Sequence, residues 1–265
     1  MIIFAADSKF CQLITNKRNI MLERLQQIDT SLLLALNGSD YMWIDLAMMM
    51  LTTRWLWVPL YILLLVVVYF TLRERDNMCE LRYDFKWQFA GVVAMFVLGI
   101  VLSDQITSGL LKEWVGRMRP SNLDNPISSQ VKVVMEYRGG PYGFPSSHAS
   151  NSFCLATLCC LYFRNRWTSV AMLFWAVIHS YTRIYLGVHY PGDVIVGALI
   201  GTVVAVAVYF AFYRILHFEE YDFKNPICKL YEKYILYGVA ASFISVAIAL
   251  ALSPFIMDFW MKYGW

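Results

Sequence analysis

Residues 55–72 read WLWVPLYILLLVVVYFTL and carry no charged side chain. A helix of this length matches the roughly 30 Å hydrocarbon core of a bilayer. Backbone polar groups cannot be left bare in lipid, and the run is far longer than a barrel strand, so a helix is predicted. Comparable runs follow at Trp87–Leu110, Ser146–Phe163, Thr168–Leu186, Val194–Phe210 and Tyr234–Phe255.

Composition points to the same class, because 59% of the 265 residues are hydrophobic and only 15% are charged. We therefore predict an all-α integral membrane protein, a helical bundle of about six transmembrane helices spanning residues 55–265. Trp55, Trp57 and Trp87 are expected to lie at the membrane–water interface.

Residues 1–54 are predicted to form a separate N-terminal segment. Apolar residues recur at helical spacing from Ile20 to Leu36 with polar residues between them, which indicates an amphipathic interfacial helix. Tyr41–Thr53 is too short to span and is expected to be a re-entrant or tilted piece. Met1–Met21 has no uninterrupted apolar core of the signal-peptide type.

Basic residues of short loops indicate the orientation, because such residues favour the cytoplasmic side. Three loops carry them, at Arg73, Arg75, Arg82 and Lys86, at Arg164 and Arg166, and at Arg214, Lys224, Lys229 and Lys233. The segments 112–147, 186–193 and 257–265 are then expected outside. This alternation leaves the side of the basic N-terminus open.

Other classes of site find little support. The six cysteines have no spacing typical of zinc sites or disulfide frameworks, and we interpret them as small packing residues. The net charge of +3 comes without a basic stripe interleaved with aromatics, which argues against nucleic acid as a partner.

Three groups of polar residues lie at the ends of apolar runs on the expected outer side. The first contains Lys112 and Arg119, followed by Pro120. The two cations are seven residues apart, so on one helix they project from the same face. They either snorkel to lipid headgroups or, given the polar residues at 103–108, line a wet cavity.

The second group, Pro145-Ser146-Ser147-His148, runs directly into an apolar helix. A helix N-terminus offers free N–H groups and a dipole that favours an anion, although a serine there also serves as an ordinary N-cap. The third group contains Arg183, His189 and Asp193. A carboxylate four residues from an imidazole can fix its tautomer and leave the other nitrogen free to attack.

Together the groups supply cations, an anion-binding helix end, an oriented imidazole and a second imidazole that can donate a proton. The chain here resembles the type 2 phosphatidic acid phosphatase family, whose pattern is Lys-x6-Arg-Pro, Pro-Ser-Gly-His and Ser-Arg-x5-His-x3-Asp. All three segments occur in order with their internal spacings intact. Ser147 and Thr182 depart from the pattern, in place of a glycine and a serine.

The resemblance implies roles for individual residues. His189 is the expected nucleophile that forms a phosphohistidine, Asp193 its orienting partner, and His148 the acid and then the base. The phosphate-binding residues implied are Lys112, Arg119, Ser146, Ser147 and Arg183. Among residues outside the pattern, Arg138 is a possible second phosphate ligand, His179 is expected to make an interhelical hydrogen bond, and Arg117 to lie on the surface.

These features predict a metal-independent lipid-phosphate phosphatase without a cofactor, in a bacterial-type inner membrane with its site on the periplasmic face. Undecaprenyl pyrophosphate is the first candidate substrate, followed by a lipid A phosphate and phosphatidylglycerol phosphate. A vanadate-dependent haloperoxidase fits less well because those enzymes are soluble. A non-catalytic lipid-phosphate binder or transporter needs the cations but not an oriented nucleophile.

Overall fold

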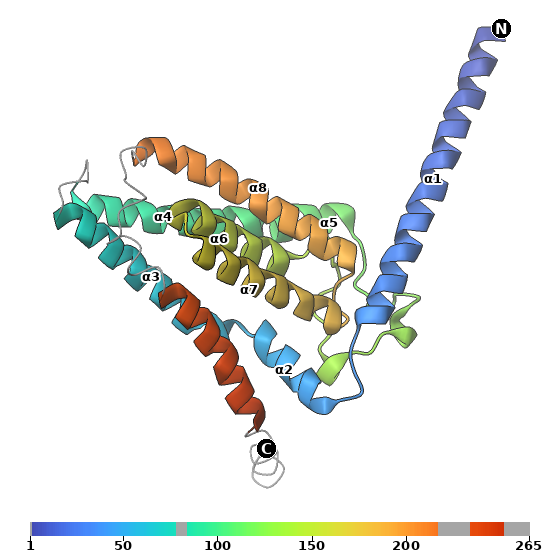
Figure 1. The fold of residues 1–265 in the computed structure, drawn as a ribbon. Coiled ribbons are helices and arrows are strands. Elements are labelled where there is room, and N and C mark those ends of the chain that lie inside the picture. The colour runs from blue at the N-terminus through green and yellow to red at the C-terminus, as the bar shows by residue number, and fades with distance from the viewer. Residues whose placement is uncertain (1, 78–83, 217–233, 252–265) are drawn as a thin grey trace.

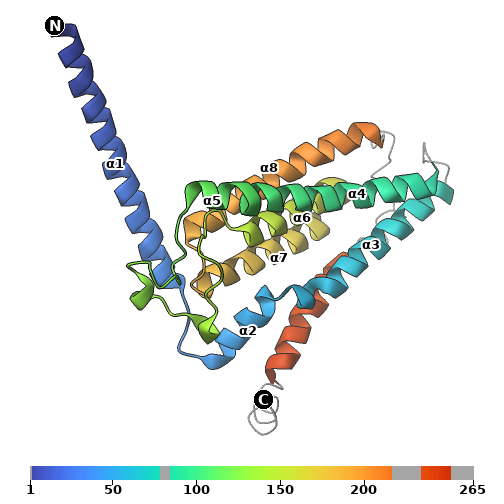
Figure 2. The ribbon, with the colours of Figure 1, turned by 180° about the vertical axis from the view of Figure 1, so that it is seen from behind.

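Long helices lie side by side in a bundle, and one further helix leaves the bundle at one end (Figures 1 and 2). The computed structural model describes residues 2–77, 84–216 and 234–251. The bundle contains α3 (Arg54–Asn77), α4 (Phe85–Asp104), α6 (Ser147–Phe163), α7 (Arg166–Tyr185), α8 (Pro191–Ile215) and the C-terminal helix Tyr234–Ala251. Helices thus occur at all six predicted runs, and the all-α prediction is confirmed.

Four of the described helices are long and apolar enough to cross a membrane, namely Arg54–Asn77, Phe85–Val115, Pro191–Ile215 and Tyr234–Ala251. The other two predicted spans are α6 and α7. α6 has 17 residues and begins in a serine-rich turn, while α7 buries His179 and Arg183. The predicted count of six is therefore approximate, because polar residues of the site occupy the ends of these two helices.

The helix ends follow from local sequence. Asp84 caps α4 by accepting a hydrogen bond from the Lys86 N–H at 2.9 Å, and Asn165 caps α7 in the same manner. Pro191 occupies the first turn of α8, where its missing N–H costs nothing. Gly116, with φ +62°, ends α5 (Lys112–Val115) in the left-handed conformation that glycine adopts readily.

α6 lies at the centre of the bundle and packs against α4, α7 and α8. It approaches α8 most closely at Gly197 and Gly201, where a Cβ would overlap the carbonyl oxygens of Ser146 and Ser150. The main core also contains Cys154 and Cys159, as expected for packing cysteines; Cys11, Cys79 and Cys228 lie outside the residues whose side chains the structure describes.

The prediction for Trp57 is wrong. Its ring is fully buried against Trp175, with ring centroids 5.6 Å apart, and its Nε1–H donates to the Leu51 carbonyl oxygen at 2.9 Å. This buried partner satisfies the indole N–H away from the interface. Trp55 and Trp87 are 81% and 76% exposed, as an interfacial position requires.

α1 (Ile2–Leu36) is attached at one end of the bundle and runs crosswise to the bundle helices (Figures 1 and 2). Seven of its apolar side chains are exposed, namely Ile20, Met21, Leu22, Leu25, Ile28, Leu32 and Leu36. α2 (Met42–Thr52) is the predicted short piece and packs on α7. That α1 lies at the bilayer surface stays a prediction. Its crosswise orientation and its exposed apolar residues support that prediction.

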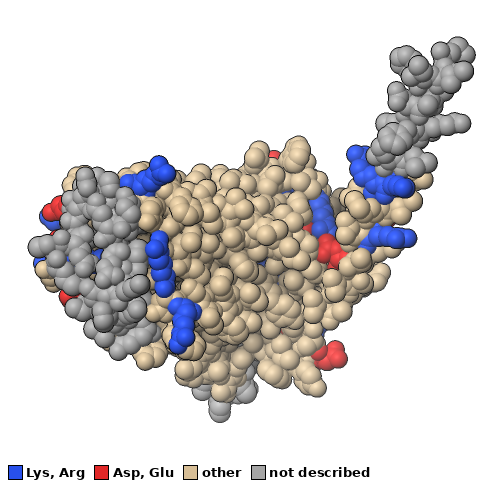
Figure 3. All heavy atoms as spheres, turned by 45° about the horizontal axis from the view of Figure 1, so that its top comes forward, with Lys and Arg blue, Asp and Glu red and all other residues tan. Residues whose placement is uncertain are grey.

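The two ends of the bundle differ in charge. Arg73, Lys86, Arg164, Arg166 and Arg214 belong to helix ends that lie together, away from α1 (Figure 1). Figure 3 shows basic side chains near that end and others near α1, with few charged side chains on the face between them. The three motif groups lie at the α1 end, in α5, α6, the α7–α8 turn and the connection that contains the short helices η2 (Ser128–Gln130) and η3 (Val134–Glu136).

We predict that Gly201→Val lowers the stability of the folded protein, because the added side chain meets the α6 backbone, which cannot rotate away. Overpacking of this kind costs about 1–3 kcal/mol. Thermal unfolding in detergent measures the effect. Gly140→Ala is the control, because no atom lies within 4 Å of the Cβ position there. Equal melting temperatures for the two variants would contradict the packing described for α6 and α8.

Candidate functional site

His189 and Asp193 lie in the α7–α8 turn and the first turn of α8, and both side chains are buried. The distance from His189 Nδ1 to Asp193 Oδ2 is 3.5 Å. The other ring nitrogen, Nε2, lies 2.9 Å from Nη1 of Arg119. An arginine only donates, so Nε2 is the acceptor and the proton is on Nδ1, facing Asp193. This tautomer leaves the Nε2 lone pair directed at the cation cluster.

Arg119 reaches His189 by a route that the helical spacing does not predict. The expectation that Lys112 and Arg119 share one helix face is wrong, since the helix ends at Val115 and Arg119 lies in the following loop. The loop is fixed by the Met118–Tyr142 bridge and by the Arg119 N–H, which donates to the Pro141 carbonyl oxygen. Nη1 of Arg119 also donates to the Val188 carbonyl oxygen at 3.1 Å.

Lys112 follows a π-helical segment, η1 (Gln105–Leu111), which continues α4. π-Helical turns are rare and often occur at functional sites. Within this segment Ser108 Oγ lies 2.6 Å from Ser147 Oγ, which joins the first motif group to the second. The charge of Lys112 lies close enough to those of Arg119 and Arg183 to interact with both. The three phosphate-binding cations of the sequence analysis therefore converge.

The second motif group forms the N-terminus of α6. Ser146 is its N-cap, with Oγ accepting from the Ala149 N–H, and the Ser146 N–H donates to the Asp193 carbonyl oxygen. The extra hydroxyl of Ser147, where the family pattern has glycine, is turned toward Ser108. His148 stacks on His179, with ring centroids 5.7 Å apart, and lies close enough to Arg183 and His189 for electrostatic interaction.

Arg183 lies in the last turn of α7 and is 2% exposed. Its Nη1 donates to Thr52 Oγ1 at 2.7 Å and its Nη2 to Tyr137 Oη at 3.2 Å. Nε of Arg183 and Nε of Arg119 have no hydrogen-bond partner within the described part of the chain. Buried donors of this kind suit an anion that arrives with the substrate. Thr52 and Tyr137 carry no sequence signal that could have identified them.

The prediction that Arg117 lies on the surface is wrong. Its Nη1 donates to Asp193 Oδ1 and its Nη2 to Asp29 Oδ2, each at 2.6 Å, and the guanidinium lies over the Tyr190 ring at 3.8 Å. Burial alone lowers the pKa of Arg117, but the carboxylates of Asp193 and Asp29 outweigh it and raise that pKa. The loop after Gly116 turns the side chain inward, which a continued helix would not do.

Two further predicted residues have structural partners. Arg138 donates to the Ser121 carbonyl oxygen at 2.7 Å, and its own carbonyl oxygen accepts from Ser121 Oγ. These two hydrogen bonds join distant parts of the loop between α5 and α6. His179 makes the expected interhelical hydrogen bond, with Nδ1 2.8 Å from Ser152 Oγ of α6. Thr182 donates to the His179 carbonyl oxygen within α7.

Burial and the clustered positive charge lower the pKa values of Arg119 and His189. Burial, and then the charge of Arg183, lowers the pKa of Arg119 to about 10, so that it stays charged at neutral pH. Burial, Arg119, Arg183 and Lys112 together hold the pKa of His189 well below its usual range. His189 is therefore neutral, as a nucleophile must be. In the described residues no cluster of three or more His, Cys, Asp or Glu side chains could hold a metal ion.

We predict that Arg119→Gln raises the pKa of His189. A nearby cation favours the neutral imidazole, so its removal lets the ring take up a proton at higher pH than in the wild type. Histidine ring NMR signals followed against pH in detergent measure the change, with His189→Gln identifying the signal. Arg138→Gln is the matched control, because it removes an arginine that does not contribute to the shift. No change in Arg119→Gln, or the same change in both variants, would contradict this account.

Comparisons with known proteins find a matching family and individual relatives. Residues 93–216 match the model of the PAP2 superfamily. The chain is 43% identical over 182 residues to a lipid A 4'-phosphatase of Bacteroides thetaiotaomicron. The aligned region covers 68% of this chain and 75% of that protein. The chain is 31% identical over 190 residues to a lipid A 4'-phosphatase of Porphyromonas gingivalis, covering 71% and 74%.

Among solved structures, a transmembrane PAP2-type phosphatidylglycerolphosphate phosphatase from Bacillus subtilis has a similar fold, with TM-score 0.50 and 21% identity over 72% of this chain and 88% of that one. The matched region contains all three motif groups. The chain therefore belongs to the PAP2 superfamily, the type 2 phosphatidic acid phosphatases.

Proposed function

We propose that this membrane lipid-phosphate phosphatase removes a phosphate from a lipid A-type substrate through a phosphohistidine on His189. The observation that carries the mechanism is the position of His189, with Nε2 2.9 Å from Arg119 and Nδ1 toward Asp193. A phosphoryl group that meets Nε2 brings its oxygen atoms against Arg119. Lys112 and Arg183 then balance the remaining negative charge.

The reaction proceeds in two displacements. In the first, Nε2 of His189 attacks phosphorus, a P–N bond forms, and the bond to the leaving oxygen breaks while His148 donates a proton to that oxygen. In the second, His148 takes a proton from water, the water oxygen attacks phosphorus, and the P–N bond breaks, which returns the electron pair to Nε2 of His189 and releases inorganic phosphate. Asp193 stabilises the positive charge that develops on the imidazole during attack.

The two relatives described above favour a lipid A-type substrate over undecaprenyl pyrophosphate. Relatives at 43% and 31% identity, each matched over about three quarters of its length, are both named lipid A 4'-phosphatase. The motif residues themselves contact only the phosphoryl group, so they do not distinguish among lipid phosphates. A lipid A-type substrate therefore takes the place of undecaprenyl pyrophosphate, the first candidate of the sequence analysis.

Phosphate release from lipid A, undecaprenyl pyrophosphate and phosphatidylglycerol phosphate, measured with purified protein in detergent and EDTA, tests the proposal. We expect the highest kcat/KM with lipid A. His189→Ala is expected to lose turnover by several orders of magnitude while keeping the wild-type melting temperature, because loss of a nucleophile has that effect. A preference for undecaprenyl pyrophosphate overturns the substrate. Turnover by His189→Ala overturns the mechanism, and loss of activity in EDTA overturns metal independence. Absence of turnover by the wild type with every substrate favours the non-catalytic binder.

We also propose that the site faces the periplasm. The basic helix ends lie at the opposite end of the bundle from the motif groups, and such residues favour the cytoplasm. Single cysteines at Ser129 and Asn77 in a cysteine-free background test this, with a membrane-impermeant thiol reagent applied to intact cells. Both positions are exposed. Labelling is expected at residue 129 and absent at residue 77, and the reverse pattern would place the site on the cytoplasmic leaflet.

A further inference from the structure

A chain of charged contacts leads from α1 to the catalytic pair. Arg117 bridges two carboxylates, with Nη1 2.6 Å from Asp193 Oδ1 and Nη2 2.6 Å from Asp29 Oδ2. These ion pairs are 24% exposed on the arginine side, 15% on Asp29 and 0% on Asp193. Hydrogen-bonded pairs with this degree of burial are strong and geometrically specific. Asp29 lies 164 positions before Asp193, so the contact joins two distant segments of the chain.

Asp29 also holds the turn that carries the catalytic residues. Its Oδ1 accepts from the Gly192 N–H at 2.7 Å, at the N-terminus of α8, where a carboxylate is favoured. A Cβ on residue 192 would lie 2.8 Å from Asp29 Oδ2, so only glycine leaves room for this approach. Asp29 therefore contacts α8 in two ways, directly at the Gly192 N–H and through Arg117 at Asp193.

The position of the Asp193 carboxylate decides whether it can act on His189. At 3.5 Å from Nδ1, Oδ2 lies beyond a good hydrogen bond, and it also accepts from the Tyr190 N–H at 3.0 Å. A small movement toward Nδ1 completes the bond, and a small movement toward Arg117 loses it. Arg117 without Asp29 has Asp193 as its one carboxylate partner and draws it away from the imidazole.

We propose that Asp29 and Arg117 are positioning residues that hold the Asp193 carboxylate in place beside His189, so that α1 completes the catalytic site. This inference rests on the proposed role of His189 as nucleophile. Neither residue belongs to the motif positions that define the family, and neither is a ligand of the phosphoryl group. Their effect is confined to the orientation of the nucleophile.

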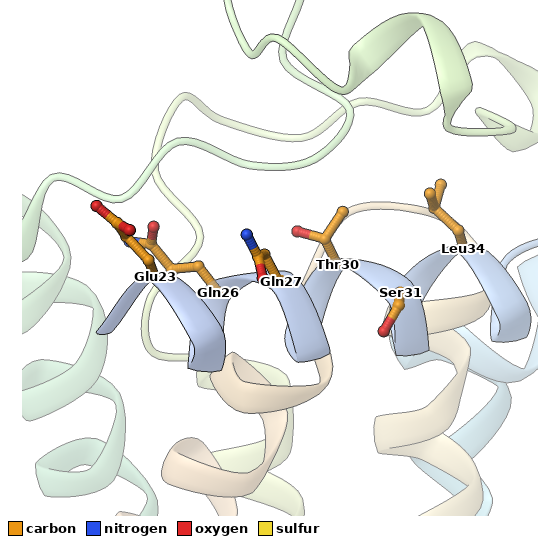
Figure 4. A pocket seen from close by; sticks show the side chains of 6 residues that line it. All are labelled: Glu23, Gln26, Gln27, Thr30, Ser31 and Leu34. Atoms are coloured by element: carbon orange, nitrogen blue, oxygen red, sulfur yellow. The ribbon is translucent and has the colours of Figure 1, made fainter. Parts of the chain in front are cut away.

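Asp29→Asn is the direct test, on a lipid phosphate that the wild type is first shown to hydrolyse. We expect kcat to fall about 10- to 100-fold, the effect of a misplaced catalytic group. KM is expected to stay within about twofold, because Lys112, Arg119 and Arg183 are untouched. Glu23→Gln is the matched control, since it removes the same charge from α1 at an open surface pocket of about 420 Å³ lined by α1 residues (Figure 4). It is expected to leave kcat unchanged.

A double-mutant cycle separates positioning from mere docking of α1. If Asp29 acts through Arg117, Asp29→Asn loses most of its effect on kcat in an Arg117→Gln background. Equal losses in both backgrounds would overturn the proposal, because they would show that α1 acts independently of the arginine. An unchanged kcat in Asp29→Asn would overturn it as well.

Arg117→Lys keeps the experiment decisive if Asp29→Asn does not fold. A lysine keeps the charge but lacks the planar fork that reaches two carboxylates at once, so kcat is expected to fall although the ion pairing is partly retained. Wild-type kcat in that variant would contradict the proposal. Failure of the proposed mechanism is recognised separately, because it is measured by turnover in His189→Ala. The positioning proposal is measured by kcat in the Asp29 and Arg117 variants.

Discussion

The structure depends on the burial of like charges around one imidazole. Lys112, Arg119 and Arg183 converge although like charges repel, and burial removes the water that would screen them. Such an arrangement is tolerated only where the surrounding structure fixes each cation or an anion arrives to balance them. Arg183 is held by Thr52 and Tyr137, and Arg119 by the Val188 carbonyl and His189. In the proposed function, the energy of this repulsion is available for binding a dianionic phosphoryl group.

The bundle supplies the rigidity that the cluster requires. α6 and α8 approach closely at Gly197 and Gly201, and the Ser146 N–H donates to the Asp193 carbonyl oxygen. These contacts tie the N-terminus of α6 to the first turn of α8. The N-terminus of α6 and the proposed nucleophile His189 thus belong to one rigid unit, and catalytic groups on rigid elements keep their geometry.

Much of the fold and most of the site follow from the sequence. Apolar runs predicted the helices because hydrophobic length is a strong local signal, and the motif spacings predicted that His189 and Asp193 would meet. The approach of Arg119 did not follow, since Gly116 ends the helix and a loop contact with Pro141 positions the arginine. Arg117, Trp57 and Asp29 were misjudged or missed for a related reason. Each contacts a residue far away in sequence, Asp193 for Arg117, Trp175 for Trp57 and Gly192 for Asp29, and no local pattern encodes such contacts.

The π-helical segment Gln105–Leu111 affects which way the side chains point before and after it along α4 and α5. Each residue added to an α-helix rotates everything after it by about 100°. The wide turn therefore gives the side chains after it a different direction from the one that a continuous α-helix would give them. Residues before it keep their contacts with α6, while Ser108 meets Ser147 and Lys112 lies near Arg119 and Arg183. A helix of uniform pitch would have to compromise between membrane packing and the orientation of its lysine.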